Sequence, residues 1–251
     1  MKRPYIREVY LRQPPAETSY LRGIPAIRHL LTGQSLRLDA PVTCLVGENG
    51  TGKSTLVEAV AVAAGFNPEG GSRNFSFATA ATHSELHSLL TVVRAAYPRD
   101  GFFLRAESFY NAITYIDELD EIPAAAPPIS AAYGGESLHH CSHGEAFLAL
   151  VQNRFGGDGL YILDDPEAAL SPTRLLTLLA EIHRLVGQQS QFIIATHSPI
   201  LMAYPGAQIL ELSREGIRSV DYRETEHYLV TRRFLQDPEG VLQTVLAEGD
   251  T

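Results

Sequence analysis

The feature that most constrains the fold is a glycine-rich segment between an apolar run and a helix-forming run. The apolar residues 42–46 predict a buried strand, and residues 55–64 predict a helix that Gly65 can end. Between them, residues 47–54 read Gly-Glu-Asn-Gly-Thr-Gly-Lys-Ser, which fits G-x-x-x-x-G-K-[ST] at every fixed position. A preceding strand and a following helix are the context in which this pattern forms a phosphate-binding loop, or P-loop. The segment therefore predicts an α/β fold that binds a nucleotide.

The residue types in this segment suit phosphate chemistry. Gly47, Gly50 and Gly52 let the backbone turn tightly, so that successive N–H groups point at phosphate oxygens. Lys53 can reach the β- and γ-phosphates, and the Ser54 hydroxyl can ligate Mg²⁺. The alternative, an ordinary glycine-rich turn with a surface lysine, is disfavoured by the flanking strand and helix. The residues expected to contact the nucleotide are Gly47, Glu48, Asn49, Gly50, Thr51, Gly52, Lys53, Ser54 and Thr55.

Length and composition fit a single domain over residues 1–251. A chain of 251 residues with 45% hydrophobic content can bury one sizeable α/β core. No apolar run approaches the ~18 residues of a membrane span, and charges occupy the positions where a signal peptide is apolar. Cys44 in the expected buried strand and the distant Cys141 make no disulfide framework. We expect a cytoplasmic protein without a transmembrane segment.

The charge balance bears on possible partners. A formal net charge of −9 argues against a surface broadly built to neutralise nucleic-acid phosphates. A local basic patch around Arg214, Arg218, Arg232 and Arg233 remains open, although solvated charge is the favoured interpretation there.

In the first half of the chain, short alternating pieces at residues 6–11 and 35–38 predict strands beside the P-loop strand. Thr82 with Glu85 forms a capping-box pattern, and an apolar stripe from Leu86 to Val93 predicts a helix that ends by Pro98. Residues 102–104 predict a strand and residues 108–119 a helix. Residues 121–137 have the composition of a long loop, a kind that is usually functional or mobile.

In the second half, apolar strands are expected at residues 160–163 and 192–195, with a helix over residues 172–187 between them. Ser171 predicts the cap of that helix. Strand, helix and strand in this order imply a right-handed crossover and a parallel sheet. A hairpin over residues 209–220 and a helical tail beyond Thr225 make up a C-terminal part over about 208–251.

Polar side chains stand at the ends of the two apolar strands. The α/β sheets bind ligands at the carboxyl ends of their parallel strands, so Asp164 can hold Mg²⁺ through a water near Ser54. The alternative role for Asp164 is that of a helix cap or a turn residue. Asp165 is then the candidate general base that orients the attacking water. His197 could contact the γ-phosphate or this water, although a histidine before Ser-Pro is more often a loop residue.

Residues 142–145, Ser-His-Gly-Glu, allow two interpretations. Ser142 and Glu145 have capping-box spacing and open a helix through Phe155. A helix N-terminus preceded by Ser142 and Gly144 is also a phosphate-binding site. The spacing does not choose between them.

Together these motifs resemble the ABC-type ATPase superfamily. In order they are Gly-Glu-Asn-Gly-Thr-Gly-Lys-Ser-Thr, Cys-Ser-His-Gly-Glu, Leu-Tyr-Ile-Leu-Asp-Asp-Pro-Glu-Ala-Ala-Leu-Ser and Ala-Thr-His-Ser, within residues 36–212. The strings Asp-Asp-Pro-Glu-Ala-Ala-Leu-Ser-Pro and Phe-Ile-Ile-Ala-Thr-His-Ser-Pro-Ile-Leu look most like stand-alone predicted AAA-family ATPases, which are related to SMC and recombination-repair ATPase heads. The resemblance implies a P-loop NTPase fold of ABC-ATPase type. Its mostly parallel central sheet would have flanking helices, some antiparallel β-structure and a helical subregion at about residues 76–155 that carries the signature motif.

The resemblance also implies roles for individual residues. Two chains would form an ATP-dependent homodimer that sandwiches two ATP molecules, with Ser142, Gly144 and Glu145 contacting the partner's ATP. Residues 169–171 would form a D-loop across the dimer interface, and His197 would be the switch histidine. Glu107 lies where the family usually has its Q-loop glutamine, and it joins Ser54 and Asp164 as a candidate metal ligand.

The sequence departs from the family pattern at two places. The signature usually reads L-S-G-G-Q/E, whereas Cys141 replaces the leucine and His143 the first glycine. The position of the catalytic glutamate holds Asp165, whose side chain is shorter by one carbon, roughly 1.5 Å. A misplacement of about 1 Å can cost on the order of 10²-fold in rate, so we expect slow intrinsic ATP hydrolysis.

Four functional interpretations follow. The first is an ATPase, with ATP and Mg²⁺, whose nucleotide-driven dimerisation works on an unidentified macromolecular partner. The second is the ATP-binding subunit of an ABC transporter, which needs a separate membrane permease. The third is a DNA-repair or phage-defence ATPase head, disfavoured by the acidic balance and the absence of coiled-coil heptads. The fourth is a sensor that binds ATP and barely hydrolyses it.

Overall fold

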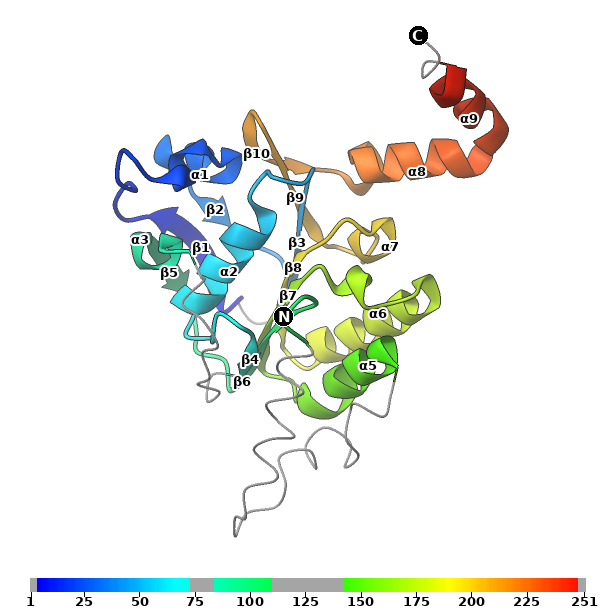
Figure 1. Cartoon of the computed structure of the whole chain (residues 1–251). Coiled ribbons are helices and arrows are strands. Elements are labelled where there is room, and N and C mark those ends of the chain that lie inside the picture. The colour runs from blue at the N-terminus through cyan, green and yellow to red at the C-terminus, as the bar shows by residue number, and fades with distance from the viewer. Residues whose placement is uncertain (1–3, 73–83, 110–141, 248–251) are drawn as a thin grey trace.

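The computed structural model describes residues 4–72, 84–109 and 142–247. Within these ranges the centre of the fold is a seven-stranded sheet of order β10-β9-β3-β8-β7-β6-β4 (Figure 1). Five neighbouring strands run parallel: β9 (Gln208–Ser213), β3 (Val42–Val46), β8 (Gln191–Ala195), β7 (Gly159–Asp164) and β6 (Asp100–Arg105). The edge strands β10 (Gly216–Val220) and β4 (Gly71–Ser72) are antiparallel. The predicted α/β fold with a mostly parallel sheet is confirmed.

Helices cover both faces of this sheet, with α2 (Lys53–Ala63) on one and α5 (His143–Arg154) and α6 (Pro172–Gly187) on the other (Figure 1). Successive residues of a strand point to opposite faces, so each strand contributes to two cores. Cys44 and Val46 belong to the core that contains the α5 and α6 side chains, whereas Leu45 packs with α2. This two-sided burial explains why β3, β7 and β8 are continuous apolar runs.

A separate three-stranded antiparallel sheet, of order β2-β1-β5, lies beside α2. It consists of β1 (Ile6–Leu11), β2 (Leu36–Arg37) and β5 (Leu90–Arg94). The prediction that the first two strands flank the P-loop strand is wrong, because β8 and β9 occupy both sides of β3. The Gln191 side chain joins the two sheets by accepting the Ile6 N–H at 2.9 Å and donating to the Ile6 carbonyl at 2.8 Å.

The helix predicted between residue 82 and Pro98 is also wrong. Helix α3 (Leu86–Leu89) is one turn long, and the chain then continues as β5. Residues 90–94 read Leu-Thr-Val-Val-Arg, and their β-branched side chains suit a strand once β1 is available as a partner. Pairing with a strand distant in the sequence has overridden the local helical spacing.

The other helices and strands that were predicted within the described residues are confirmed. The predicted cap of α6 is also confirmed, because the Ser171 side chain accepts the Arg174 N–H. The turns and short helices between them are η1 (Tyr20–Gly23), α1 (Pro25–Leu31), η4 (Pro166–Ala168), α7 (Pro199–Met202) and η5 (Tyr222–Glu224). Thr82, Cys141, residues 110–119 of one predicted helix and the predicted loop at 121–137 lie outside the described residues. The expected helical subregion at about 76–155 is therefore described only in part.

Two helices follow the hairpin and project from the body of the molecule: α8 (Glu226–Gln236) and α9 (Pro238–Ala247) (Figure 1). The Thr225 hydroxyl caps α8 by accepting the Tyr228 N–H. Neither helix contains a buried residue. In the part of the chain that the structure describes, no helix combines the length and apolar character needed to cross a membrane.

Candidate nucleotide-binding site

The loop between β3 and α2 has a backbone that glycine adopts more readily than other residues. The φ angles of Gly47, Gly50 and Gly52 are +139°, +82° and +97°. A Cβ atom at Gly47 would lie 2.1 Å from the Leu212 carbonyl oxygen, and one at Gly52 would lie 2.3 Å from Cγ2 of Ile24. Glycine is therefore needed both for the turn and for close packing. The N-terminus of α2 follows directly, with N–H groups that an anion can use.

Lys53 is buried at the start of α2. Its Nζ donates to the carbonyl oxygens of Gly47 at 2.7 Å and Glu48 at 2.9 Å. Burial lowers the pKa of Lys53, while the carboxylates of Asp165 and Asp164 act in the opposite direction. The ammonium group thus lies inside the curve of the loop, beside the N–H groups that would face a phosphate.

A cavity of about 320 Å³ opens above this loop. It brings together P-loop residues and the ends of two strands that are more than 100 residues further along the chain. Its lining consists of Ile24, Asn49, Gly50, Gly52, Lys53, Ser54, Thr55, Asp165 and His197. The structure therefore gathers the candidate residues of the P-loop, the predicted general base and the predicted switch histidine around one space.

Asp164 lies at the end of β7, with 5% of its surface exposed. Its carboxylate is hydrogen-bonded by the Ser54 side chain, but Oδ1 is buried with no hydrogen-bond partner among the described residues. Burial raises the pKa of Asp164 to about 6, against the lowering effect of Arg105. Mg²⁺ prefers oxygen ligands and is usually bound by one or two carboxylates together with phosphates. The orphaned carboxylate oxygen beside a hydroxyl fits that requirement.

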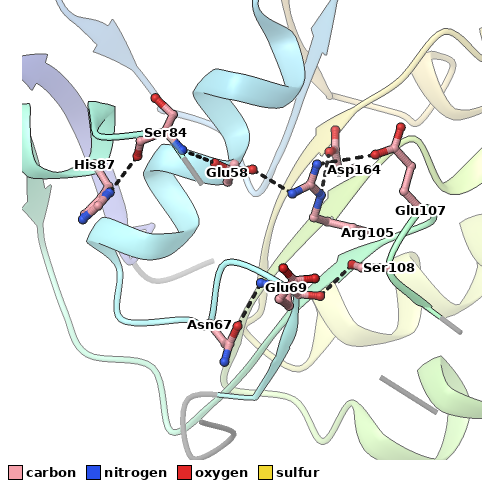
Figure 2. A network of polar contacts seen from close by, with 9 residues as sticks. All are labelled: Glu58, Asn67, Glu69, Ser84, His87, Arg105, Glu107, Ser108 and Asp164. Atoms are coloured by element: carbon pink, nitrogen blue, oxygen red, sulfur yellow. Dashed lines mark hydrogen bonds and ion pairs between the residues drawn. The ribbon is translucent and has the colours of Figure 1, made fainter. Parts of the chain in front are cut away.

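Arg105 connects this carboxylate to two others, as Figure 2 shows. It lies at the end of β6, in register with Asp164 on β7. Its guanidinium contacts Glu58 at 2.7 Å, Asp164 at 3.5 Å and Glu107 at 3.7 Å. The Glu107 side chain is 88% exposed, so Glu107 lies at the rim of this group, and its proposed role as a metal ligand stays a prediction. Arg105 was not identified from the sequence, although a cation at the end of an apolar strand was a usable signal.

Asp165 has an unusual backbone conformation. Its φ and ψ are both 49°, in the left-handed region, and its N–H donates to the Ala195 carbonyl at 3.1 Å. Aspartate and asparagine are enriched there relative to other side chains, which gives a backbone reason for aspartate at this position. Its Oδ1 is buried without a hydrogen-bond partner in the described residues, and the residue lines the cavity. An unengaged carboxylate oxygen beside the cavity is the property that a general base needs.

Glu167 was not identified from the sequence. From η4, its carboxylate accepts hydrogen bonds from the Thr196 hydroxyl at 2.8 Å and from the backbone N–H of His197. Burial raises its pKa, and these two donors act in the opposite direction. Because these donors occupy the Glu167 carboxylate, its oxygens are engaged, unlike Oδ1 of Asp165. The Glu167 carboxylate ties the loop that carries His197 to the end of β7.

His197 has a second, unexpected neighbour. Its Nδ1 lies 3.1 Å from Nε2 of His227 on α8, and the ring centroids are 5.3 Å apart. Burial is the main cause that lowers the pKa of both histidines. No motif covers His227, and only the folded chain reveals this contact.

The predicted signature segment lies elsewhere. The Ser142 N–H and hydroxyl donate to Glu145 at 2.9 and 2.7 Å, so the capping-box interpretation is confirmed. Arg174 donates to both residues, at 3.1 and 2.7 Å. A Cβ at Gly144 would lie 2.9 Å from the Ala169 carbonyl oxygen, which explains this glycine by packing. None of these residues lines the cavity, so their contact with a nucleotide stays a prediction.

Two families of known proteins match separate parts of the chain. Residues 21–97 match "AAA domain", and residues 145–203 match "AAA domain, putative AbiEii toxin, Type IV TA system". A relative in Haemophilus influenzae is described as "Uncharacterized ABC transporter ATP-binding protein". It is 25% identical over 191 residues, which are 69% of this chain and 70% of the relative.

A solved structure shares the fold. The chain is similar to cbiO1 from Clostridium perfringens, part of the ABC transporter complex cbiONQ, with a TM-score of 0.51 and 16% identity over 94% of this chain and 96% of that one. The SMC head domain from Thermotoga maritima gives a TM-score of 0.45 and 15% identity, over 86% of this chain and 99% of that one. The first of these likenesses supports the assignment of the fold.

Proposed function

Because its fold and its order of motifs are those of the ABC-type ATPase superfamily, a class of ATP-binding ATPases, we propose that this chain binds Mg-ATP and hydrolyses it slowly. We further propose that ATP-dependent homodimerisation drives or signals a change in a macromolecular partner. One observation carries the catalytic part: the cavity above the P-loop is lined by Lys53, Ser54, Asp165 and His197 together.

Each residue has a role in this proposal. The N–H groups of the P-loop and the N-terminus of α2 bind the phosphates, and Lys53 turns from its backbone carbonyls to the β- and γ-phosphates. Ser54 and Asp164 would hold Mg²⁺, which would neutralise charge on the phosphate oxygens. Asp165 orients the attacking water through its unengaged oxygen, and His197 contacts the γ-phosphate end.

Slow turnover follows from the side chain at position 165. Aspartate is shorter than the glutamate usual in the family, and a displacement of about 1 Å can cost on the order of 10²-fold in rate. The contacts of Glu167 support this reasoning, because that carboxylate is already engaged and cannot act as a substitute base.

Dimerisation is proposed because, by the resemblance to ABC-type ATPases, Ser142, Gly144 and Glu145 would contact ATP bound to a second chain. Ser142 and Glu145 are exposed at the start of α5, outside the cavity. In a sandwich dimer these residues would meet the phosphates bound to the second chain, with residues 169–171 at the interface. The Ser142 hydroxyl would then exchange its present contacts for a phosphate oxygen.

A second candidate function is that of the ATP-binding subunit of a transporter. It is favoured by the description of the relative in Haemophilus influenzae as an ABC transporter ATP-binding protein. It requires a separate membrane permease, so co-purification with a membrane protein would favour it over the first candidate.

The test combines ATP turnover with light scattering for the wild type, Lys53→Ala, Asp165→Asn and Asp165→Glu. We expect slow wild-type turnover, loss of nucleotide binding in Lys53→Ala, and an ATP-bound dimer in Asp165→Asn. Asp165→Glu should raise the rate. The matched control is Asp158→Glu, since Asp158 is exposed and also left-handed, with a φ of 44°. Absence of ATP binding by the wild type would refute the proposal, and an unchanged or lower rate in Asp165→Glu would refute the explanation of slow turnover.

A further inference from the structure

The projecting helix α8 reaches the candidate site through His227. Its Nε2 lies 3.1 Å from Nδ1 of His197, and the two rings are inclined at 55°. His197 in turn lines the cavity above the P-loop, whereas His227 does not. His227 is therefore placed to act on the cavity through His197.

Helix α8 also lines a cavity beside the P-loop. A second cavity, of about 530 Å³, is bounded on one side by Glu48 and Asn49 and on the other by His227 and Val230. His197 lines both cavities, as does Asn49. His197 is thus part of the boundary of the candidate nucleotide site, and His227 contacts it from the second cavity.

The hydrogen bond between the rings constrains where their protons lie. A neutral imidazole has one N–H donor and one acceptor nitrogen. Nδ1 of His227 is buried with no hydrogen-bond partner in the described part of the chain. A buried N–H without an acceptor is costlier than a buried lone pair without a donor, so the His227 proton belongs on Nε2. It is then donated to Nδ1 of His197, whose own proton must lie on Nε2.

We propose that His227 is a positioning residue that fixes the ring orientation and tautomer of His197, so that His197 offers an N–H group to the terminal phosphate of a bound nucleoside triphosphate. The other tautomer would offer a lone pair, which repels a phosphate oxygen. The lowered pKa values of both histidines agree with neutral rings near pH 7. The phosphate contact rests on the proposed function, whereas the tautomer of His197 does not.

The first test reads the tautomer directly, without nucleotide. Long-range ¹H–¹⁵N spectra of the histidine-labelled protein at pH 7.5 contain signals from nine histidines, and the His197→Ala variant identifies those of His197. We expect a proton on Nε2 of His197 and a hydrogen-bonded Nδ1. His227→Phe should shift the Nδ1 signal toward that of a free lone pair, while His227→Gln, which retains an N–H donor, should largely preserve it.

The second test measures turnover. His227→Phe should lower kcat by about tenfold, the equivalent of one hydrogen bond, with little change in ATP affinity. His227→Gln should recover most of the rate, and in a His197→Ala background His227→Phe should have no further effect. His183→Phe is the matched control, because its ring also makes one hydrogen bond, to the Tyr204 hydroxyl at 3.3 Å, away from the cavity. Loss of folding is not expected, since no residue of α8 is buried.

The outcomes separate the two proposals. A protein that fails to bind ATP refutes the proposed function, and the spectra still decide whether His227 fixes the tautomer of His197. A proton on Nδ1 of His197 in the wild type, or an Nδ1 signal that His227→Phe leaves unchanged, overturns the role of His227. An active His227→Phe variant whose kcat equals that of the wild type also overturns the role of His227.

Discussion

Removing the Glu167 carboxylate should both destabilise the fold and impair the site. This carboxylate accepts hydrogen bonds from the hydroxyl of Thr196, which is fully buried, and from the backbone N–H of His197. Glu167→Ala leaves both donors without an acceptor. It also releases the loop that carries His197 from the end of β7.

The expected magnitude follows from these two contacts. Hydrogen bonds to charged groups contribute about 1.5–3 kcal/mol each. The raised pKa of Glu167, caused mainly by burial, indicates that part of this gain is offset by desolvation of the carboxylate. We therefore expect Glu167→Ala to lower the free energy of unfolding by about 3 kcal/mol, near the lower bound of the sum. For a chain of this size that corresponds to a fall in Tm of about 6–12 °C. Glu167→Gln retains one acceptor oxygen and should lose about 1 kcal/mol.

The assay is thermal unfolding without nucleotide, followed by ATP turnover at a temperature where every variant is folded. Glu17→Ala is the control, because Glu17 is exposed and should change the stability by less than about 0.5 kcal/mol. We expect turnover to fall in both Glu167 variants, and more in Glu167→Ala. A Glu167→Ala protein that melts within about 2 °C of the wild type would show that the two contacts are not stabilising, and the reasoning would fail.

Three further predictions concern stability. Arg105→Leu removes the cation from the buried Asp164 and the half-buried Glu58, and it should cost about 3–5 kcal/mol in urea unfolding. The control is Arg37→Leu, which breaks an exposed ion pair and should leave the urea midpoint almost unchanged, so equal losses would contradict this reasoning. Burial raises the pKa of Asp100, but hydrogen bonds from Gly156, Arg154 and Tyr161 outweigh it and hold this pKa below its usual value. The Asp100 carboxylate therefore stabilises the fold above about pH 4, and this stabilisation is lost as the pH falls through the lower folded-state pKa. As the pH is lowered from about 5 to about 2, the urea midpoint should fall more steeply below about pH 4 in the wild type than in Asp100→Asn, and parallel curves would refute the assignment. Gly47→Ala should lose nucleotide binding and should melt well below the control Gly33→Ala. Both glycines have a positive φ, but only Gly33 has open space for a Cβ atom. Similar melting temperatures would count against the steric explanation.

Features that depend on local sequence were predicted well. The turn-forming glycines of the P-loop, the apolar strands β3, β7 and β8, and the caps of α5 and α6 all follow from residue types at fixed spacing. Such features depend on backbone sterics, side-chain periodicity and contacts over a few residues. The gathering of Asp165 and His197 near the P-loop was also predictable, because the carboxyl ends of parallel strands meet at one edge of a sheet.

Features that depend on distant partners were missed or wrong. Residues 90–94 have helical spacing in isolation, and only the presence of β1 makes them a strand. The roles of Arg105, Glu167 and His227 likewise depend on groups 30 or more residues away in the chain. Charge, hydrogen-bond geometry and burial at these positions arise only when the elements pack together.

The sequence by itself therefore determined the type of fold and the candidate phosphate-binding loop, because short-range sterics and the alternation of apolar residues are encoded locally. The tertiary structure alone decided which strand pairs with which, which carboxylate stays unengaged, and that a histidine from the last part of the chain meets the candidate site. These outcomes depend on competition between distant groups for the same hydrogen-bond donors, acceptors and buried space, and no local pattern records the result of that competition.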